Sequence, residues 1–200
     1  MTRLITREQQ KVLDSRFSEV TGLPSILLME QAASGLSEFI ADLVHAYDIG
    51  TEYDVVFFTG AGNNGGDGWA SARQLMASGC RVAVYDLYPN RELSPDAEIN
   101  RAAYKRLGGE VITKREDVAK IKAQFVVDAI YGTGFDVKRP LSDSAKEALS
   151  LLVSMKESGS LVIACDIPSG VDANTGIAAP EAVKADVTIT VEGKIKVLKD

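Results

Sequence analysis

The chain has 200 residues, 46% hydrophobic and 25% charged, which is the composition of one ordinary globular domain with a substantial core. Its net charge of −6 at pH 7 argues against a nucleic-acid partner, which would need a basic face, although backbone N–H groups at helix starts can still bind a small anion. No apolar stretch approaches the ~18–20 residues of a membrane span, and residues 1–10 are too polar for a signal peptide, so we expect a cytoplasmic protein with no membrane partner.

Two helices are predicted at the N-terminal end of the chain. Thr6 and Gln9 fit a capping box that begins the first helix. Ser25 fits the N-cap of a longer second helix, in which apolar residues recur at helical spacing as far as Tyr47. We expect these two helices, at about residues 7–47, to pack on an α/β core that follows them.

From residue 54 onward, short β-branched or aromatic runs alternate with helical segments. The predicted strands are residues 54–58, 81–85, 110–113, 125–130, 161–165 and 187–191. Strands that are apolar on both faces and alternate with helices indicate an α/β fold, in which a mostly parallel sheet is covered by helices on both sides. In such sheets ligands bind beyond the carboxyl ends of the strands, so the loops at those ends are the place to look for chemistry.

Three of these strand ends carry loops that combine glycine with an acidic residue. The loops are residues 60–68, 128–135 and 165–172. Five glycines in the first loop would allow left-handed turns and a ligand's close approach, and the N-terminal amides of a helix over residues 69–78 would face it. Asp67, Asp128 and Asp166 would lie close together if the three strands are neighbours. Because like charges brought together raise a pKa or recruit a cation, this edge indicates a site for a cofactor-sized anion and a metal ion.

Each of these features also has an ordinary structural explanation. A single glycine-rich turn is often only a turn, and Asp67 could be a helix-start residue stabilised by the helix dipole. Asp172 is interpreted as part of an ordinary turn, and Trp69 as a packing residue. His45, the only histidine, lies in the second predicted helix away from the strand ends and receives no chemical role. Three such loops together are harder to explain as turns alone.

An NAD(P)-dependent oxidoreductase is the first alternative. Gly60, Gly62 and Gly65 match the spacing of the dinucleotide-binding fingerprint between a strand and a helix, and Asp86 ends the next strand, where a ribose-binding acid is expected. Against this, Asp67 would crowd the pyrophosphate and repel it in a low-dielectric site. The sequence also has no visible catalytic histidine or Tyr-x-x-x-Lys arrangement.

The three loops resemble the signature blocks of the YjeF N-terminal domain family. The matching blocks are Gly62-Asn63-Asn64-Gly65-Gly66-Asp67-Gly68, Asp128-Ala129-Ile130-Tyr131-Gly132-Thr133-Gly134 and Asp166-Ile167-Pro168-Ser169-Gly170. Residues 27–32 resemble a helix of the same family, although Ala33 stands where the family usually has glycine. The resemblance extends from about Thr6 to about Thr190, and the three blocks in this order are highly specific.

The resemblance implies a Rossmann-like three-layer α/β/α sandwich formed by one domain over residues 1–200. It implies an isomerase, NAD(P)H-hydrate epimerase, which interconverts the R and S forms of hydrated NADH and NADPH (NADHX and NADPHX). It further implies one potassium ion per subunit, bound by Asn64, Asp128 and Ser169. The residues implied to bind the substrate are Asn63, Asn64, Gly65, Gly66, Asp67, Gly132, Thr133, Gly134, Phe135, Asp136, Val137, Lys138 and Asp166.

The family's partners and variants add further expectations. The resemblance implies a homodimer, and a separate or fused ADP- or ATP-dependent NAD(P)HX dehydratase as a functional partner. The C-terminal end, after Thr190, is shorter than in the family, which leaves open whether the chain was cut from a bifunctional enzyme. Relatives that act as non-catalytic binding scaffolds form the second alternative. Such scaffolds generally lose the Asn-Asn-Gly-Gly-Asp and Asp-Ile-Pro-Ser-Gly blocks, and both are intact here.

The implied substrate suggests a mechanism. Its hydroxyl is on C6 of the nicotinamide ring, next to the ring nitrogen, so this hemiaminal can lose hydroxide and regain water on the other face. We expect Asp166 to act as the acid that assists hydroxide departure and then as the base that activates water. Burial and neighbouring carboxylates would raise its pKa, whereas potassium would lower it.

Overall fold

The computed structural model describes residues 6–47, 50–192 and 194–198. Within these ranges seven strands form one sheet in the order β3-β2-β1-β4-β5-β6-β7. The strands are β1 (Tyr53–Thr59), β2 (Val82–Asp86), β3 (Glu110–Ile112), β4 (Ala123–Ala129), β5 (Leu161–Cys165), β6 (Val187–Glu192) and β7 (Lys194–Leu198). All neighbours from β3 to β6 pair in parallel, and β7 pairs antiparallel with β6. The mostly parallel sheet is therefore confirmed.

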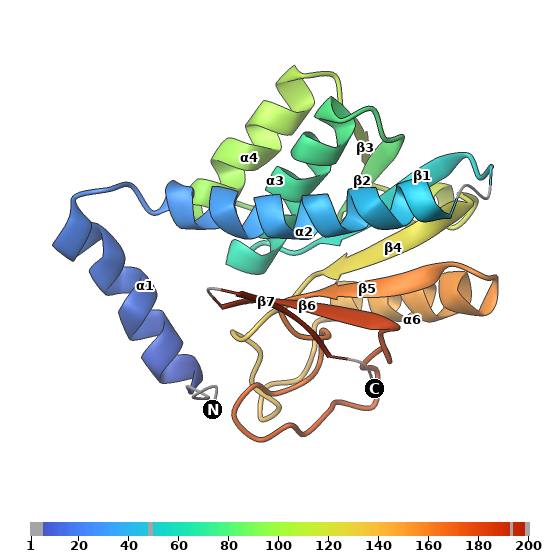
Figure 1. Ribbon diagram of the computed structural model, residues 1–200. Coiled ribbons are helices and arrows are strands. Elements are labelled where there is room, and N and C mark those ends of the chain that lie inside the picture. Colours follow the sequence, from blue (N-terminus) through green and yellow to red (C-terminus); the bar gives the residue numbers. More distant parts are fainter. Residues whose placement is uncertain (1–5, 48–49, 193, 199–200) are drawn as a thin grey trace.

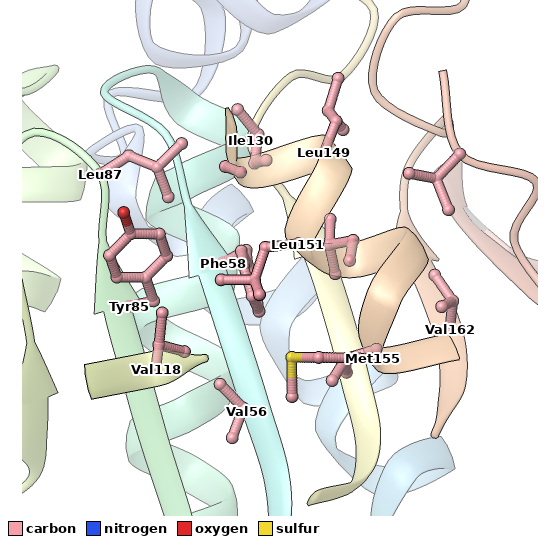
Figure 2. Close-up of a cluster of buried hydrophobic side chains, with 14 of the residues drawn as sticks. Val56, Phe58, Tyr85, Leu87, Val118, Ile130, Leu149, Leu151, Met155 and Val162 are labelled. Carbon is pink, nitrogen blue, oxygen red and sulfur yellow. The ribbon is translucent and has the colours of Figure 1, made fainter. Parts of the chain in front are cut away.

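Helices cover both faces of this sheet (Figure 1). They are α1 (Arg7–Thr21), α2 (Ile26–Ala46), α3 (Asn63–Ala77), α4 (Pro95–Arg106), α5 (Arg115–Val118) and α6 (Asp143–Glu157). Alternate residues of β1 point to opposite faces of the sheet. Phe57 packs in the hydrophobic cluster formed with α2, α3 and α4, whereas Val56 and Phe58 pack in the hydrophobic cluster formed with α6. Figure 2 shows this second cluster, where Met155 and Leu151 of α6 lie over the β1 side chains. The three-layer Rossmann-like architecture is confirmed.

The predicted strands agree with the observed ones to within two residues at each end. The central strands β1 and β4 are easy to identify because they bury residues on both faces, so their sequences are continuous apolar runs. The sequence analysis missed β7. It begins Lys-Ile-Lys, an alternation of three residues that is too short to stand out from a loop, and its antiparallel pairing with β6 comes from the tertiary structure.

Helix α3 begins at Asn63, six residues earlier than the predicted start, and the glycine-rich segment forms its first turns. The expected left-handed turns are wrong, because none of the glycines at 60–68 has a positive φ. Glycine is needed here for close packing instead. A Cβ on Gly65 would overlap the carbonyl oxygen of Gly60, and one on Gly68 would lie 2.7 Å from the Cβ of Ala129. The absence of side chains lets α3 lie directly against β1 and β4.

The two N-terminal helices differ in how they meet the core. Thr6 and Gln9 form the predicted capping box of α1, and α2 packs on α3 with Leu36 and Ile40 fully buried. Ser25 adopts helical backbone angles and donates its hydroxyl to Asp96 rather than capping α2. In contrast to the expectation that both helices pack on the core, α1 buries none of its residues and stands apart from the sheet (Figure 1).

None of the helices in the described ranges has the length and apolar character that a membrane span requires.

Candidate active site

The strands that precede the three signature loops are immediate neighbours in the sheet. Thr59 at the end of β1 pairs with Ala129 of β4, and Asp128 of β4 pairs with Ala164 of β5. Because all three strands run in the same direction, the loops that follow them meet at one edge of the sheet. The condition on which the predicted gathering of Asp67, Asp128 and Asp166 depended is therefore met.

Asp128 and Ser169 form the buried floor of this edge. The backbone N–H of Ser169 donates to Asp128 Oδ2 at 2.8 Å, and its hydroxyl donates to Oδ1 at 2.5 Å. Both residues are at most 1% exposed, and burial raises the pKa of the Asp128 carboxyl while the bonds from Ser169 lower it. Among the described residues, no lysine, arginine or histidine forms an ion pair with Asp128. A buried carboxylate with hydrogen bonds but no cationic side chain favours a bound cation.

Asn64, in the first turn of α3, has a buried side-chain amide. Both Nδ2 and Oδ1 are buried and have no hydrogen-bond partner among the described residues. A Cβ on Gly132 would lie 3.1 Å from Asn64 Oδ1 and 2.6 Å from Asp166 Oδ2, so both side chains lie against this glycine. A buried unsatisfied amide costs about 1–3 kcal/mol, so a site that keeps one is suited to a ligand that completes its hydrogen bonds.

Asp166 follows β5 in a conformation that a non-glycine residue rarely adopts. Its φ of +69° is the only positive φ of a non-glycine residue in the described ranges. The backbone is held by a hydrogen bond from the Asp166 N–H to the carbonyl of Ile189, and Oδ2 accepts the N–H of Thr133 at 3.0 Å. Such strain persists only where the surroundings impose it, and it is concentrated at functional sites. Here it aims the carboxylate at the turn that begins with Gly132.

Asp67 completes the acidic group from the side of α3. Burial and the neighbouring carboxylate of Asp166 raise the pKa of the Asp67 carboxyl well above its usual range, and Asp14 of α1 adds to this effect. The buried thiol of Cys165 has a raised pKa, caused by burial and then by Asp67, Asp166 and Asp128. Asp67 and Asp166 are therefore within electrostatic reach of each other, and all three aspartates act on the thiol of Cys165.

The remaining residues of the loop after β4 are held mostly through their backbone. The N–H of Phe135 donates to the carbonyl of Gly132, and the Phe135 side chain packs into the core. Val137 N–H donates to Asp172 Oδ2 at 3.3 Å. Asp172 also accepts N–H bonds from Asn174 and from Thr175, as an ordinary turn residue does, and these bonds, led by that from Val137, lower the pKa of its carboxyl.

One contact with this loop was missed by the sequence analysis. Arg7, the first residue of α1, donates from its guanidinium to the carbonyl of Phe135 at 3.1 Å. Its backbone N–H donates to Asn174 Oδ1, whose amide in turn donates to Glu8. The start of α1 is thus attached to two loops at the site edge. No sequence signal marks such pairs, because more than a hundred residues separate the partners.

Two other residues fit their structural explanations. Trp69 is fully buried and packs against Tyr104 with ring centroids 5.6 Å apart. Asp86 is 1% exposed and is neutralised by Arg101 and Lys105, at 3.4 and 3.9 Å. A carboxylate already paired with two cations in the interior is poorly placed to bind a ribose, which removes one of the two sequence features that supported the oxidoreductase alternative.

Comparison with known proteins agrees with these features. The model of the family described as "YjeF-related protein N-terminus" matches residues 25–196. An NAD(P)H-hydrate epimerase of Limosilactobacillus reuteri is 32% identical over 94% of this chain and 84% of its own length. One from Rhodopirellula baltica is also 32% identical, over 93% of this chain and 73% of that protein.

Longer and more distant relatives extend the comparison. A bifunctional NAD(P)H-hydrate repair enzyme Nnr of Dictyoglomus turgidum is 33% identical over 94% of this chain, which spans about a third (35%) of that enzyme. The crystal structure of yeast ynu0 superimposes with a TM-score of 0.78 at 20% identity, covering 94% of this chain and 80% of the yeast chain. At that identity the superposition establishes the shared fold alone.

Proposed function

The chain belongs to the family of YjeF-related N-terminal domains, and on that basis we propose that it is an NAD(P)H-hydrate epimerase, an isomerase that repairs hydrated nicotinamide cofactor. Its substrates are then NADHX and NADPHX, whose R and S forms it interconverts. The observation that carries the proposal is the strained Asp166 carboxylate, held against Gly132 beside the unpartnered amide of Asn64. In this proposal Asp166 is the acid–base group, and the amide of Asn64 supplies hydrogen bonds to the ligand at the same edge of the sheet.

The chemistry follows from the substrate's hemiaminal. Asp166 donates a proton to the C6 hydroxyl, and the C6–O bond breaks with release of a water molecule. The ring is left as a cation, which the adjacent nitrogen stabilises. Water then adds to C6 from the opposite face and returns its proton to Asp166, so the step is balanced without any oxidant. Asp67 supports this role, because two adjacent carboxyls retain a shared proton at higher pH than an isolated one does. Such proton transfer contributes about 10²–10⁴-fold to the rate.

The substrate-binding residues in this proposal come from two of the three signature loops, together with Asp166 from the third. They are Asn63, Asn64, Gly65, Gly66 and Asp67 of α3, and Gly132, Thr133, Gly134, Phe135, Asp136, Val137 and Lys138 of the loop after β4. Gly134 is exposed and has open space where a Cβ would lie, which allows a ligand to approach the backbone closely, and the N–H groups at the start of α3 favour an anion.

Asn64, Asp128 and Ser169 are proposed to hold one potassium ion. These residues offer only oxygen ligands from their side chains, which suits a hard cation rather than zinc. The unpartnered Asn64 oxygen and the Asp128 carboxylate, which lacks a cationic partner among the described side chains, support the fit. When bound, the ion would offset the buried charge of Asp128 and attract anionic groups of the substrate.

A homodimer and a functional link to an NAD(P)HX dehydratase complete the proposal. Val12, Leu13 and Val20 of α1 are 53%, 57% and 77% exposed, so this helix offers an apolar face that a second copy could cover. The bifunctional relatives are consistent with a repair pathway of two activities. We place the protein in the cytoplasm, and support comes from Cys80 and Cys165, which are buried and unpaired as in a reducing compartment.

The decisive experiment follows one purified diastereomer. We expect R-NADHX to relax to the R/S mixture far faster with this protein than without it, with no oxidised nucleotide formed. Asp166→Asn should keep the fold, because asparagine tolerates the left-handed conformation, and should lose about 10²–10⁴-fold of the rate. Chromatography of the two forms gives the rate, and circular dichroism checks the fold.

The control for this experiment is Asp117→Asn, which neutralises an exposed carboxylate on α5 that, among the described residues, pairs with Lys120 alone. It should leave the rate unchanged. A wild-type rate equal to the spontaneous background would favour the non-catalytic scaffold, and the appearance of oxidised nucleotide would favour the oxidoreductase. Near-wild-type turnover by Asp166→Asn would remove this residue from the mechanism.

A further inference from the structure

A cavity of about 230 Å³ lies next to the candidate site, is lined partly by Phe135 and Val137 of the proposed substrate-binding loop, and takes no part in the proton transfer at Asp166. One wall comes from the loop after β4 and the start of α6, and the other from residues 178–181, which precede β6. Its apolar lining comes from Phe135, Val137, Pro140, Leu141, Ala179 and Pro180. The charged groups that also line it are Arg139, Lys146 and Glu181, the last two of which pair at 3.4 Å.

The first wall continues directly from the catalytic edge. Thr133, whose N–H binds the Asp166 carboxylate, is two residues from Phe135, so their Cα atoms are at most about 7 Å apart. The cavity therefore begins where the proposed substrate-binding loop leaves the aspartate. A ligand seated at Asp166 could extend past this loop into the cavity.

The second wall is also attached to a signature loop. The N–H of Ala179 donates to the carbonyl of Gly170 at 2.7 Å, and Val171 forms a β-bridge with Ala178. Gly170 has a φ of +92°, and a Cβ there would lie 3.1 Å from that of Ala182, so this close approach requires glycine. Gly170 directly follows Ser169, which binds Asp128. Both walls are thus positioned by the loops that form the candidate active site.

We propose that this cavity is the subsite for the adenine ring of the hydrated dinucleotide, an inference that rests on the proposed epimerase function. Ligand pockets for whole small molecules measure about 300–1,000 Å³, so this smaller cavity suits one ring system rather than the entire substrate. Adenine is the flat aromatic part of that substrate. The pyrophosphate and riboses are polar, and the hydrated nicotinamide must lie at Asp166.

Arg139 supports the same occupant. Its side chain is exposed at the cavity and makes no ion pair with another described residue. A guanidinium can stack on a purine or bind a phosphate through two donors, and a nucleotide presents both groups together. Lys146 is instead occupied by Glu181.

The first test asks whether the cavity binds adenine in the unmodified protein. AMP, which is the adenine half of the substrate, should shift the backbone amide NMR signals of Ala178, Ala179 and Phe135. Ala178→Trp, which would fill the cavity from an exposed position, should weaken AMP binding about tenfold, or ~1.4 kcal/mol. Ile177→Trp is the matched control, because Ile177 is the neighbouring residue, is 55% exposed and does not line the cavity.

The second test separates the subsite from catalysis. Ala178→Trp should raise KM for NADHX about tenfold at unchanged kcat, and should leave KM for hydrated reduced nicotinamide mononucleotide, which lacks adenine, unchanged. AMP-induced NMR shifts confined to other residues, or an equal rise in KM of Ala178→Trp for both substrates, would overturn the adenine subsite and leave the epimerase function standing. Conversely, AMP binding in the cavity of a protein that does not epimerise NADHX would retain an adenine site and overturn the function.

Discussion

At the scale of single residues, two aspartates in the same turn-rich edge have opposite electrostatic surroundings. Asp67 has a raised pKa because it is buried near Asp166, whereas Asp172 has a lowered pKa because backbone N–H groups donate to it. The sequence shows both simply as acids in polar loops. Their difference has a measurable consequence for stability as a function of pH.

The Asp67 carboxyl binds its proton more tightly in the folded state than in the unfolded chain. Ionising it therefore disfavours folding, and stability from this group falls as pH rises above its unfolded pKa of about 4. Asp67→Asn should accordingly raise Tm at pH 7 and lose most of that advantage near pH 3. Thermal unfolding followed by circular dichroism in potassium-free buffer at both pH values measures this effect.

Asp172→Asn should shift Tm at pH 7 in the opposite direction from Asp67→Asn in the same experiment. A carboxyl with a lowered pKa contributes stability above its unfolded pKa and loses it as pH falls through the folded value. This variant should therefore lower Tm at pH 7, and its difference from the wild type should shrink as pH falls below the unfolded pKa of about 4. If both variants shifted Tm in the same direction at pH 7, the assigned surroundings would be wrong.

At the scale of elements, the most informative one is α3. Its first turns hold three glycines, a composition that would usually argue against a helix, because each glycine costs up to about 1 kcal/mol relative to alanine. The helix forms there because tertiary packing against β1 and β4 requires backbone without side chains. Local propensity predicted a loop, and close packing overrode it.

Gly68→Ala tests this explanation. Alanine improves helix propensity, but its Cβ would lie 2.7 Å from that of Ala129 and 3.1 Å from Thr59 Cγ2, so we expect a net destabilisation of about 1–3 kcal/mol. Gly134→Ala is the control, because nothing lies within 4 Å of its added Cβ and its φ is not positive. Urea denaturation gives both free energies of unfolding. A stability of Gly68→Ala equal to or above that of the wild type would contradict close packing as the reason for glycine.

At the scale of the whole molecule, the candidate cation site joins segments that are distant in sequence. Asn64 comes from α3, Asp128 from β4 and Ser169 from the loop after β5. A ligand that binds the folded state and not the unfolded chain stabilises by mass action, and a site built from three segments does not exist in the unfolded chain. Stability should therefore depend on the cation present.

We expect potassium chloride to raise Tm above the value in choline chloride at equal ionic strength. At a concentration 100 times Kd, the stabilisation would be about 2.7 kcal/mol. Asn64→Ala, which removes one proposed ligand from a partly exposed position, should reduce this potassium effect, whereas Asp117→Asn should leave it unchanged. Equal Tm values in the two salts for the wild type would remove potassium from the proposal.

The sequence alone determined the features that depend on local patterns. Short β-branched or aromatic runs identified β1 to β6, the Thr6–Gln9 pair identified the start of α1, and the three signature blocks identified the family. Each of these signals lies within one short segment. The chemistry of burial, capping and motif spacing can be recognised there without knowing what the segment contacts.

Only the tertiary structure decided how those segments meet. It placed β1, β4 and β5 side by side, imposed the left-handed conformation on Asp166, paired Asp86 with Arg101, and formed the cavity between two site loops. It also extended α3 back to Asn63 and added β7. These outcomes depend on contacts between residues far apart in the chain. Local periodicity and motif spacing do not indicate which distant residue a side chain will contact.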